Sequence, residues 1–322
     1  MSKFKNLLKT VLAGGAGVAA LAAVNAAIQR SATEPDNSAL GGAARFFTWR
    51  RGQIFYKESG LSNPGLPIVF VHGVGAGMSS FMWRKNFEEL ANDFPVYALD
   101  LLGFGFSDKP AIAEYSASLY IELISDFIRE VVGGPCNVIA SSLAASYAVC
   151  VADEHPELVN ALILNTPAGY DALHARPGMA GAAFYGLLQS PVLGTSFYNV
   201  MASERSIRDY ARRTLFYDYR RVTDRLVANL YATSHQPGAQ YAIAAFLSGY
   251  LNVDMRMVFS RLDQRIVLVW GKQDVTNPIS HANALLGLNQ RSELEVFDFC
   301  RSMPEQEHPE KFNGLVSKVC GE

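Results

Sequence analysis

The stretch NVIASSLAASYA, residues 137–148, joins an apolar run directly to a helical pattern through Ala140-Ser141-Ser142-Leu143-Ala144. The residues before the link have strand character and those after it have helix character. The link follows the pattern small-x-Ser-x-small, a relaxed form of the G-x-S-x-G turn that presents a nucleophilic serine. Such a turn leaves no room for large side chains two residues before or after the serine, and alanine meets that demand, though less well than glycine. The stretch predicts a strand–turn–helix unit with Ser142 at its tip, and an ordinary serine-rich helix start is the competing interpretation.

Strand and helix patterns alternate on both sides of this unit. Apolar runs typical of buried parallel strands occur in residues 66–73, 94–100, 136–140, 159–167 and 264–274, and helical patterns separate them. Alternation of this kind predicts an α/β fold, a mostly parallel, doubly wound sheet with helices on both faces. It stops near residue 170 and resumes near residue 261, and the segment between is predicted to be a helical insertion.

Three more motifs lie at the ends of predicted strands. VFVHGVGAG, residues 69–77, ends a strand in His72-Gly73-Val74, and VYALDLLGFGFSDKP, residues 96–110, places Asp100 at a strand end. RIVLVWGKQD, residues 265–274, ends in a Gly-x-x-Asp turn with Asp274. Because the carboxyl ends of parallel strands meet at one edge of a sheet, these turns are expected to lie near the Ser142 turn.

In this order and spacing, from about residue 45 to 320, the motifs resemble the α/β-hydrolase fold superfamily, nearest to its epoxide-hydrolase, dehalogenase and esterase branch. The resemblance implies an α/β-hydrolase fold with an inserted helical cap. It also implies that Ser142 is the nucleophile, that the backbone N–H groups of Val74 and Leu143 form the oxyanion hole, and that Asp274 is the orienting acid. His72 and Asp100 are then expected to brace their loops. No cofactor and no metal is implied.

The histidine that should complete this set is missing from CRSMPEQEHPEKF, residues 300–312. The family usually ends in G-H-x-P-H-x-E-x-P, and when the two prolines are matched, Ser302 stands at the catalytic histidine position. A serine hydroxyl needs a base within about 3 Å to become a useful nucleophile, and Ser302 cannot supply one.

Several replacements for this base stay open. His308 is the nearest histidine in the sequence and is a candidate relocated base. Glu305 or Glu307 would serve if one of them is buried and its pKa is raised. His281, His174 and His235 are further histidines that could reach the site from the insertion or from the helix after Asp274. Without any base, catalysis would be much reduced.

The chain is predicted to have four parts: an N-terminal membrane anchor or signal segment (1–30), a polar linker (31–44), the core (45–170 and 261–322) and the cap (171–260). The cap sequence is apolar and aromatic with few charges, which favours an apolar pocket and a lipophilic small molecule as substrate or ligand.

Lys3, Lys5 and Lys9 precede an apolar run from about Val11 to Ile28. Positive charge before an uncharged apolar stretch is typical of a membrane-directed segment. A signal peptide cut after Ala26, an uncut anchor and an ordinary alanine-rich surface helix all stay open. We expect a membrane-associated or exported protein, or a cytoplasmic one if the segment is not a targeting signal.

Net charge, glycine spacing and cysteine spacing argue against nucleic-acid-binding, dinucleotide-binding and metal-binding proteins. The net charge of −2 gives no basic excess for binding nucleic acid. A dinucleotide fingerprint is incomplete, because its third glycine falls at Met78. The four cysteines have no metal-binding spacing; Cys300 and Cys320 are candidates for a disulfide, and four free thiols are the alternative.

These observations support two functions. The first is a serine hydrolase acting on an ester or acyl-type bond of an apolar small molecule, with Ser142, Asp274 and an unidentified or absent base. The alternative is a non-catalytic relative that keeps the pocket and binds a lipophilic ligand.

Overall fold

A single eight-stranded sheet forms the centre of the computed structural model, which describes residues 2–111, 114–171 and 173–321, without the side chains of residues 2–16 and 37. The strands are β1 (Ala43–Trp49), β2 (Gly52–Ser59), β3 (Ile68–Val71), β4 (Val96–Leu99), β5 (Cys136–Ser141), β6 (Val159–Asn165), β7 (Arg265–Gly271) and β8 (Glu293–Phe297). Their order in the sheet is β1-β2-β4-β3-β5-β6-β7-β8. β2 pairs antiparallel with β1 and β4, and the other pairings are parallel.

Helices cover both faces of the sheet, because successive residues of the buried strands point to opposite sides. Val138 of β5 packs in the cluster that contains α3 and α4, whereas Ile139 packs in the cluster that contains α2 and α13. The core helices are α2 (Phe87–Leu90), α3 (Ala117–Phe127), α4 (Leu143–Glu154), α11 (Ser280–Leu288), α12 (Pro304–Glu307) and α13 (Pro309–Gly321), with a 3-10 turn η2 (Ser80–Trp83) and a π turn η3 (Ile128–Val132). The predicted fold class is confirmed.

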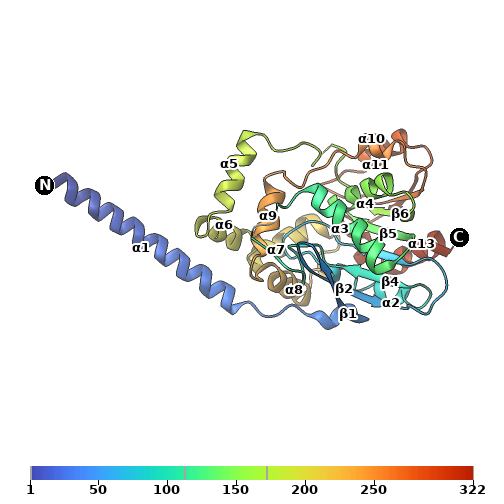
Figure 1. Cartoon of the computed structure of the whole chain (residues 1–322), viewed down its shortest axis with the longest axis horizontal. Coiled ribbons are helices and arrows are strands. Elements are labelled where there is room, and N and C mark those ends of the chain that lie inside the picture. The colour runs from blue at the N-terminus through green and yellow to red at the C-terminus, as the bar shows by residue number, and fades with distance from the viewer. Residues whose placement is uncertain (1, 112–113, 172, 322) are drawn as a thin grey trace.

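The insertion between β6 and β7 is helical, as predicted. It contains α5 (Met179–Leu188), α6 (Leu193–Met201), α7 (Glu204–Tyr210), α8 (Asp224–Ser234), α9 (Ala239–Leu247) and α10 (Arg256–Phe259), with short turns η4 (Ala211–Leu215) and η5 (Tyr219–Arg221). In Figure 1 α5, α6 and α9 lie on the side of the body from which the N-terminal helix extends. This insertion forms one wall of the cavity described below.

The N-terminal segment forms one helix, α1 (Ser2–Ser31), followed by a short turn η1 (Asn37–Leu40). It projects from the body, and its C-terminal half is the part that reaches the cap (Figure 1). Within the described residues, no helix combines enough length with enough apolar character to cross a membrane. The four cysteines are free thiols, so the predicted alternative of a Cys300–Cys320 disulfide is wrong.

One helix expected from the sequence is broken. Residues 79–93 have a helical pattern, but the structure forms only η2 and the four-residue α2 there. The break lies at Asn86, whose buried amide donates to the carbonyl oxygen of Glu305 at 3.1 Å and to Oδ1 of Asn313 at 2.8 Å. These bonds tie the segment to α12 and α13, and satisfying a buried amide takes precedence over helix continuity.

Candidate active site

The turn between β5 and α4 holds Ser142 in a rare backbone conformation. Its φ is 53° and its ψ is −125°, a region that residues other than glycine seldom adopt. The N–H of Ser142 donates to the carbonyl oxygen of Asn165 at 2.9 Å, and its carbonyl oxygen accepts from Ala145 and Ala168. Ala140 and Ala144 are fully buried, as the predicted turn requires of its flanking residues. The turn therefore exists where the sequence placed it, and Ser142 lines the main cavity.

Two backbone N–H groups beside Ser142 are free to bind a ligand. Leu143 is the first residue of α4, so its N–H has no carbonyl partner within the helix. Val74 lines the cavity, and its N–H donates to no acceptor in the described part of the chain. Gly73 brings the two loops together, since a Cβ added there would lie 3.4 Å from the Cβ of Ser142. The geometry fits the predicted pair of donors at the N-terminal end of a helix, where negative charge is favoured.

His72 braces its loop. Its Nδ1 lies 2.8 Å from the carbonyl oxygen of Gly73, and its Nε2 lies 3.0 Å from the backbone nitrogen of Leu101. The N–H of Leu101 can donate only if Nε2 is unprotonated, so the ring is neutral and donates from Nδ1. Complete burial, which outweighs the nearby charge of Asp100, lowers the pKa of His72 and favours the same state. Both nitrogens are occupied, which leaves no nitrogen to serve Ser142.

Asp274 and Ser302 form a pair in the wall of the cavity. The Ser302 hydroxyl donates to Oδ2 of Asp274 at 2.8 Å. Oδ1 accepts from the backbone N–H and the hydroxyl of Thr276 at 2.8 and 2.9 Å and from the N–H of Asn277 at 3.0 Å. Serine therefore takes the hydrogen bond that a histidine ring would make with this carboxylate. The structure brings Ser142, Val74, Asp274 and Ser302 to one cavity, as predicted.

Glu305 is the buried carboxyl group of this cavity. It is 1% exposed, and its Oε2 accepts from the side-chain amide of Asn165 at 3.0 Å. Since the carbonyl oxygen of Asn165 binds the N–H of Ser142, Glu305 is two hydrogen bonds from the serine turn. Burial raises the pKa of Glu305 to about 8, although Arg84 and Asn165 favour the charged form. The condition set from the sequence, a buried glutamate with a raised pKa, holds for Glu305.

Glu307 has different hydrogen-bond partners from Glu305. Its Oε1 accepts from the backbone N–H groups of Tyr217 and Asp218, each at 2.9 Å, and its Oε2 accepts from the N–H of Arg301 at 2.9 Å. It is buried and does not line the cavity. Its oxygens are used to hold the cap segment against α12, so the alternative of Glu307 as the base is not supported.

None of the histidines proposed as a replacement base reaches the cavity wall. Of the described residues that line the cavity, His72 is the one histidine. His308 ends α12 with its Nε2 3.3 Å from the carbonyl oxygen of Phe299, so the hypothesis of a relocated base is not supported. His281 faces Asn277 and Asp171, His235 stacks on Tyr231, and His174 lies against the backbone of its own loop.

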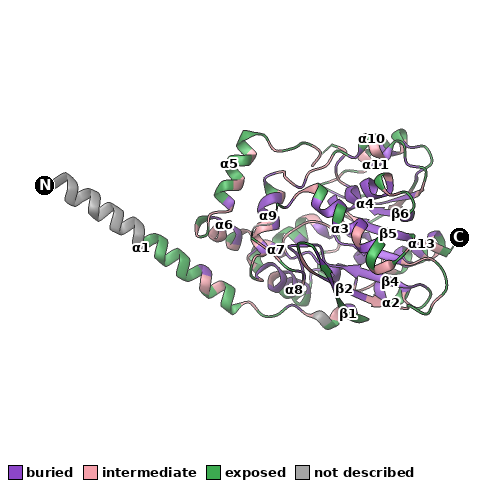
Figure 2. Ribbon diagram, viewed as in Figure 1, coloured by how far each residue is buried: buried purple, intermediate pink, exposed green. Residues whose placement is uncertain are grey.

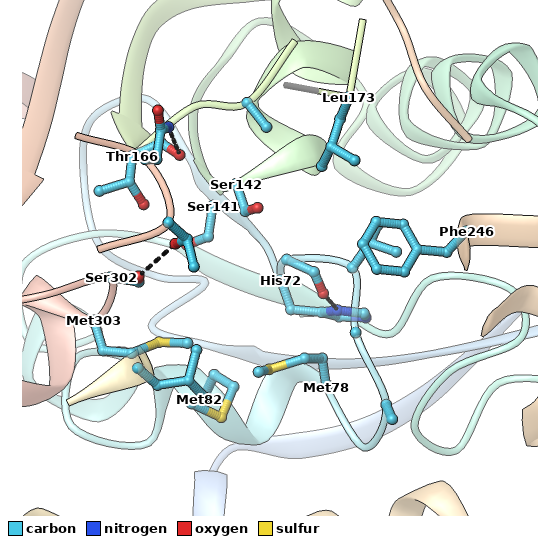
Figure 3. Close-up of a pocket in the computed structure, with 18 of the residues that line it drawn as sticks. His72, Met78, Met82, Ser141, Ser142, Thr166, Leu173, Phe246, Ser302 and Met303 are labelled. Carbon is cyan, nitrogen blue, oxygen red and sulfur yellow. Dashed lines mark hydrogen bonds between the residues drawn. The ribbon is translucent and has the colours of Figure 1, made fainter. Parts of the chain in front are cut away.

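The cavity has a volume of about 630 Å³ and is mostly apolar. Figure 3 shows Met78, Met82 and Met303 gathered on one side of it, with Leu173 and Phe246 across from them and Ser142 and Ser302 between. The cap residues that line it are Asp171, Leu173, Met201, Ser206, Ile207, Tyr210, Leu215, Leu230, Ile243, Phe246 and Leu247. This volume suits a small organic molecule, and the lining favours an apolar one.

Sequence reasoning missed Asn165 and could not choose among the cap residues. Asn165 ends β6 and pairs in register with Ser141, so its position at the carboxyl end of the neighbouring strand was an available signal. Most of the cap residues come from four helices with no motif, and only the fold brings them together.

The chain matches known proteins along most of its length. A sequence profile of the alpha/beta hydrolase family matches residues 68–315. The chain is 27% identical over 270 residues to 2-hydroxymuconate semialdehyde hydrolase of Pseudomonas sp. (strain CF600), covering 81% of this chain and 89% of that one. It is also 27% identical over 264 residues to 2-hydroxy-6-oxo-6-(2'-aminophenyl)hexa-2,4-dienoic acid hydrolase of Metapseudomonas resinovorans, covering 80% and 83%.

Solved structures agree with the fold. The meta-cleavage product hydrolase CumD of Pseudomonas fluorescens IP01 superposes with a TM-score of 0.70 at 22% identity, covering 88% of this chain and 98% of that one. A membrane phospholipase A superposes with a TM-score of 0.69 at 21% identity, covering 99% and 97%. The family profile spans more than half of the chain, and the sheet, the Ser142 turn and the helical insertion agree with that family's fold. This chain therefore belongs to the alpha/beta hydrolase family.

Proposed function

We propose that this protein is a serine hydrolase that cleaves an ester or similar acyl bond of an apolar small molecule, with Ser142 as nucleophile. The observation that carries the proposal is the Ser142 turn, which holds a hydroxyl on the wall of an apolar cavity of about 630 Å³ beside two unbonded backbone N–H groups. The two hydrolases matched at 27% identity support a hydrolytic reaction for this chain.

The backbone donors would act on the charge that develops during attack. When Ser142 Oγ bonds to the acyl carbon, the carbonyl oxygen becomes an oxyanion, and the N–H groups of Val74 and Leu143 are placed to bind it. Loss of one such donor typically costs about 3 kcal/mol of barrier. Asp274 stays in the site as the family acid, but its partner is now Ser302.

Glu305 is the group that we propose takes the proton of Ser142. With a pKa of about 8, it releases its own proton near neutral to slightly basic pH and becomes an acceptor. The proton then passes from Glu305 to the leaving group, whose bond to the acyl carbon breaks. Water attacks the acyl-enzyme, gives its proton to Glu305 and releases the acid product, and the proton returns to Ser142 Oγ.

Turnover of p-nitrophenyl esters of increasing acyl length tests the proposal. Wild-type protein is expected to hydrolyse medium-length acyl esters in preference to the acetate, because the cavity is apolar, and Ser142→Ala is expected to lose this activity. Folded wild-type protein that shows no serine-dependent turnover would contradict the proposal.

A second function is favoured by one observation, the serine in place of histidine on Asp274. A protein with this site and no working base would bind a lipophilic ligand without cleaving it. Binding of an apolar fluorescent probe by both wild-type and Ser142→Ala, with no turnover by either, would establish this alternative over the first.

A further inference from the structure

An exposed apolar surface extends over the N-terminal helix and two helices of the cap. It is formed by Val18, Leu21 and Val24 of α1, Met179, Phe184 and Leu187 of α5, and Leu193, Phe197 and Val200 of α6, which are 36 to 93% exposed. We call these nine residues the apolar cap surface. Figure 2 shows α5 and the described half of α1 as largely exposed, and α6 as partly exposed, on the same side of the molecule. Contiguous apolar surface of this kind marks an interaction site.

Specific contacts join the three helices into one surface. Asn25 of α1 is 8% exposed and donates to the carbonyl oxygen of Val192 at 3.1 Å and to Oγ of Ser196 at 3.0 Å. It also accepts from Nδ2 of Asn199 at 3.0 Å. A buried, fully used asparagine therefore fixes α1 to α6. The rings of Phe184 and Phe197 meet edge to face, with centroids 6.2 Å apart, and join α5 to α6.

The exposed part of α1 is apolar on every side. Residues 17–24, GVAALAAV, are all exposed, although none of them is polar. A helix that is apolar all round is normally buried in a protein interior or a membrane, because the exposure of apolar side chains to water is unfavourable. Within residues 17–31 of α1, the body of the protein covers the helix only from Asn25 onward, so something else is needed to cover residues 17–24.

The distribution of charge favours a lipid bilayer as the partner that covers these exposed apolar residues. The sequence has no charged residue between Lys9 and Arg30, and none between Arg176 and Glu204, a segment that includes all of α5 and α6. A surface that binds another protein normally has an apolar centre and a polar, charged rim. A surface that contacts a bilayer lacks charge over the whole contact area. Lys3, Lys5 and Lys9 lie at the far end of α1, where anionic headgroups favour each basic residue by about 1 kcal/mol.

We propose that the apolar cap surface docks on an anionic lipid bilayer, with α1 and the cap helices α5 and α6 in contact with it together. The surface adjoins the cavity wall at two helices. α6 contributes Phe197 and Val200 to the surface and the next residue, Met201, to the cavity wall. Leu247 of α9 lines the cavity and is 39% exposed, and α9 packs against α5. Docking would bring the cavity next to a source of lipophilic molecules.

Flotation of the full-length protein with vesicles tests the docking. One set of vesicles is pure phosphatidylcholine, and the other contains 30% phosphatidylglycerol. Wild-type protein is expected to float with the anionic vesicles at least tenfold more than with the neutral ones, and less at high salt. The double variant Phe197→Asp/Val200→Asp changes only exposed cap residues outside the cavity lining, and its binding is expected to fall at least tenfold. Met257→Asp, at a 77% exposed position on α10 outside this surface, is the matched control and should bind as wild type does.

Three results would overturn the proposal: no flotation of wild-type protein, unchanged flotation of the cap variant, or a stable dimer in solution that the cap variant dissociates, which would identify a second copy as the cover. Thermal unfolding of each variant shows whether it is folded. Turnover of a water-soluble ester separates docking from catalysis, because the cap variant should keep it. Flotation of wild-type protein without any ester turnover would contradict the proposed hydrolysis but would still support docking on the bilayer.

Discussion

At the scale of single residues, the site is defined by one exchange, serine for histidine at position 302. Asp274 keeps the surroundings of an orienting acid, with donors from Thr276 and Asn277, while Ser302 takes the place of the ring that would be oriented. The rest of the arrangement around Ser142 is present. Under the proposed function, the site therefore lacks one side chain of a full triad.

Ser302→His is expected to raise ester turnover, because the new ring would face Asp274 on one side and the cavity that holds Ser142 on the other. General-base help of this kind is worth roughly 10² to 10⁴-fold. Steady-state kinetics with a p-nitrophenyl ester measure the change. Ser302→Ala is the control, and it should not gain activity. If Ser302→His shows no gain while remaining folded, the assignment of Asp274 or of the oxyanion donors is wrong.

Glu305 makes turnover depend on pH. Since the acceptor must be ionised, wild-type activity is expected to rise with pH and to level off above the pKa of about 8. Glu305→Gln should lose roughly 10² to 10⁴-fold in turnover and should also lose this pH dependence. A pH–rate profile of the two proteins measures both effects. An unchanged profile in Glu305→Gln would remove Glu305 from the reaction.

The same carboxyl group affects stability in the opposite direction. Its pKa rises from an ordinary value of 4.5 to about 8 on folding, so the folded protein retains a proton that the unfolded chain releases between these values. The contribution of Glu305 to stability is therefore greatest below pH 4.5 and falls as pH rises from 4.5 to about 8. The loss amounts to roughly 3 kcal/mol at pH 7. Urea unfolding of Glu305→Gln, which cannot ionise, should lack this decline, and a parallel decline in both proteins would contradict the assignment.

At the scale of elements, short turns position the chemistry and a buried carboxylate attaches the cap. The sequence predicted the β5–α4 turn from its small flanking residues, and the structure forms it. It could not predict the break at Asn86, because the partners of that amide lie more than two hundred residues away. Short-range sequence patterns predicted the local elements, and hydrogen bonds to distant residues explain why a predicted helix is broken.

Glu307→Ala is expected to destabilise the protein by roughly 3 to 5 kcal/mol, because three backbone N–H groups lose a buried charged acceptor. Two of them belong to Tyr217 and Asp218 of the cap, so the cap should also become more sensitive to protease near those residues. Urea unfolding and limited proteolysis measure the two effects. Glu307→Gln keeps acceptor capacity and should lose less. Equal stability of Glu307→Ala and wild type would show that these bonds do not attach the cap.

At the scale of the whole molecule, the fold and an apolar pocket were predictable, whereas the volume of the pocket and the residues of its cap wall were not. Alternating strand and helix patterns predicted the mostly parallel sheet, and the turn motifs that follow its strands include Ser142, Val74 and Asp274, which the structure brings to one cavity. The cavity volume and its cap wall depend on how six helices without a motif pack together, which no short-range pattern encodes. The raised pKa of Glu305 likewise depends on burial that only the assembled chain creates.

The N-terminal helix shows the same division. Its composition predicted a membrane-directed segment, but its attachment to α6 through Asn25 and its continuity with the exposed residues of the cap appear only in three dimensions. The molecule thus combines an alpha/beta hydrolase fold with a serine bonded to Asp274 and an apolar exterior next to its cavity.

Labelling with a fluorophosphonate tests most directly whether Ser142 is an activated nucleophile. Intact-mass spectrometry of the wild-type protein should show one adduct, located on Ser142 by peptide mapping, that forms faster as pH rises toward 8 and does not form in Ser142→Ala. Folded wild-type protein that stays unlabelled, or an adduct that persists in Ser142→Ala, would contradict the account.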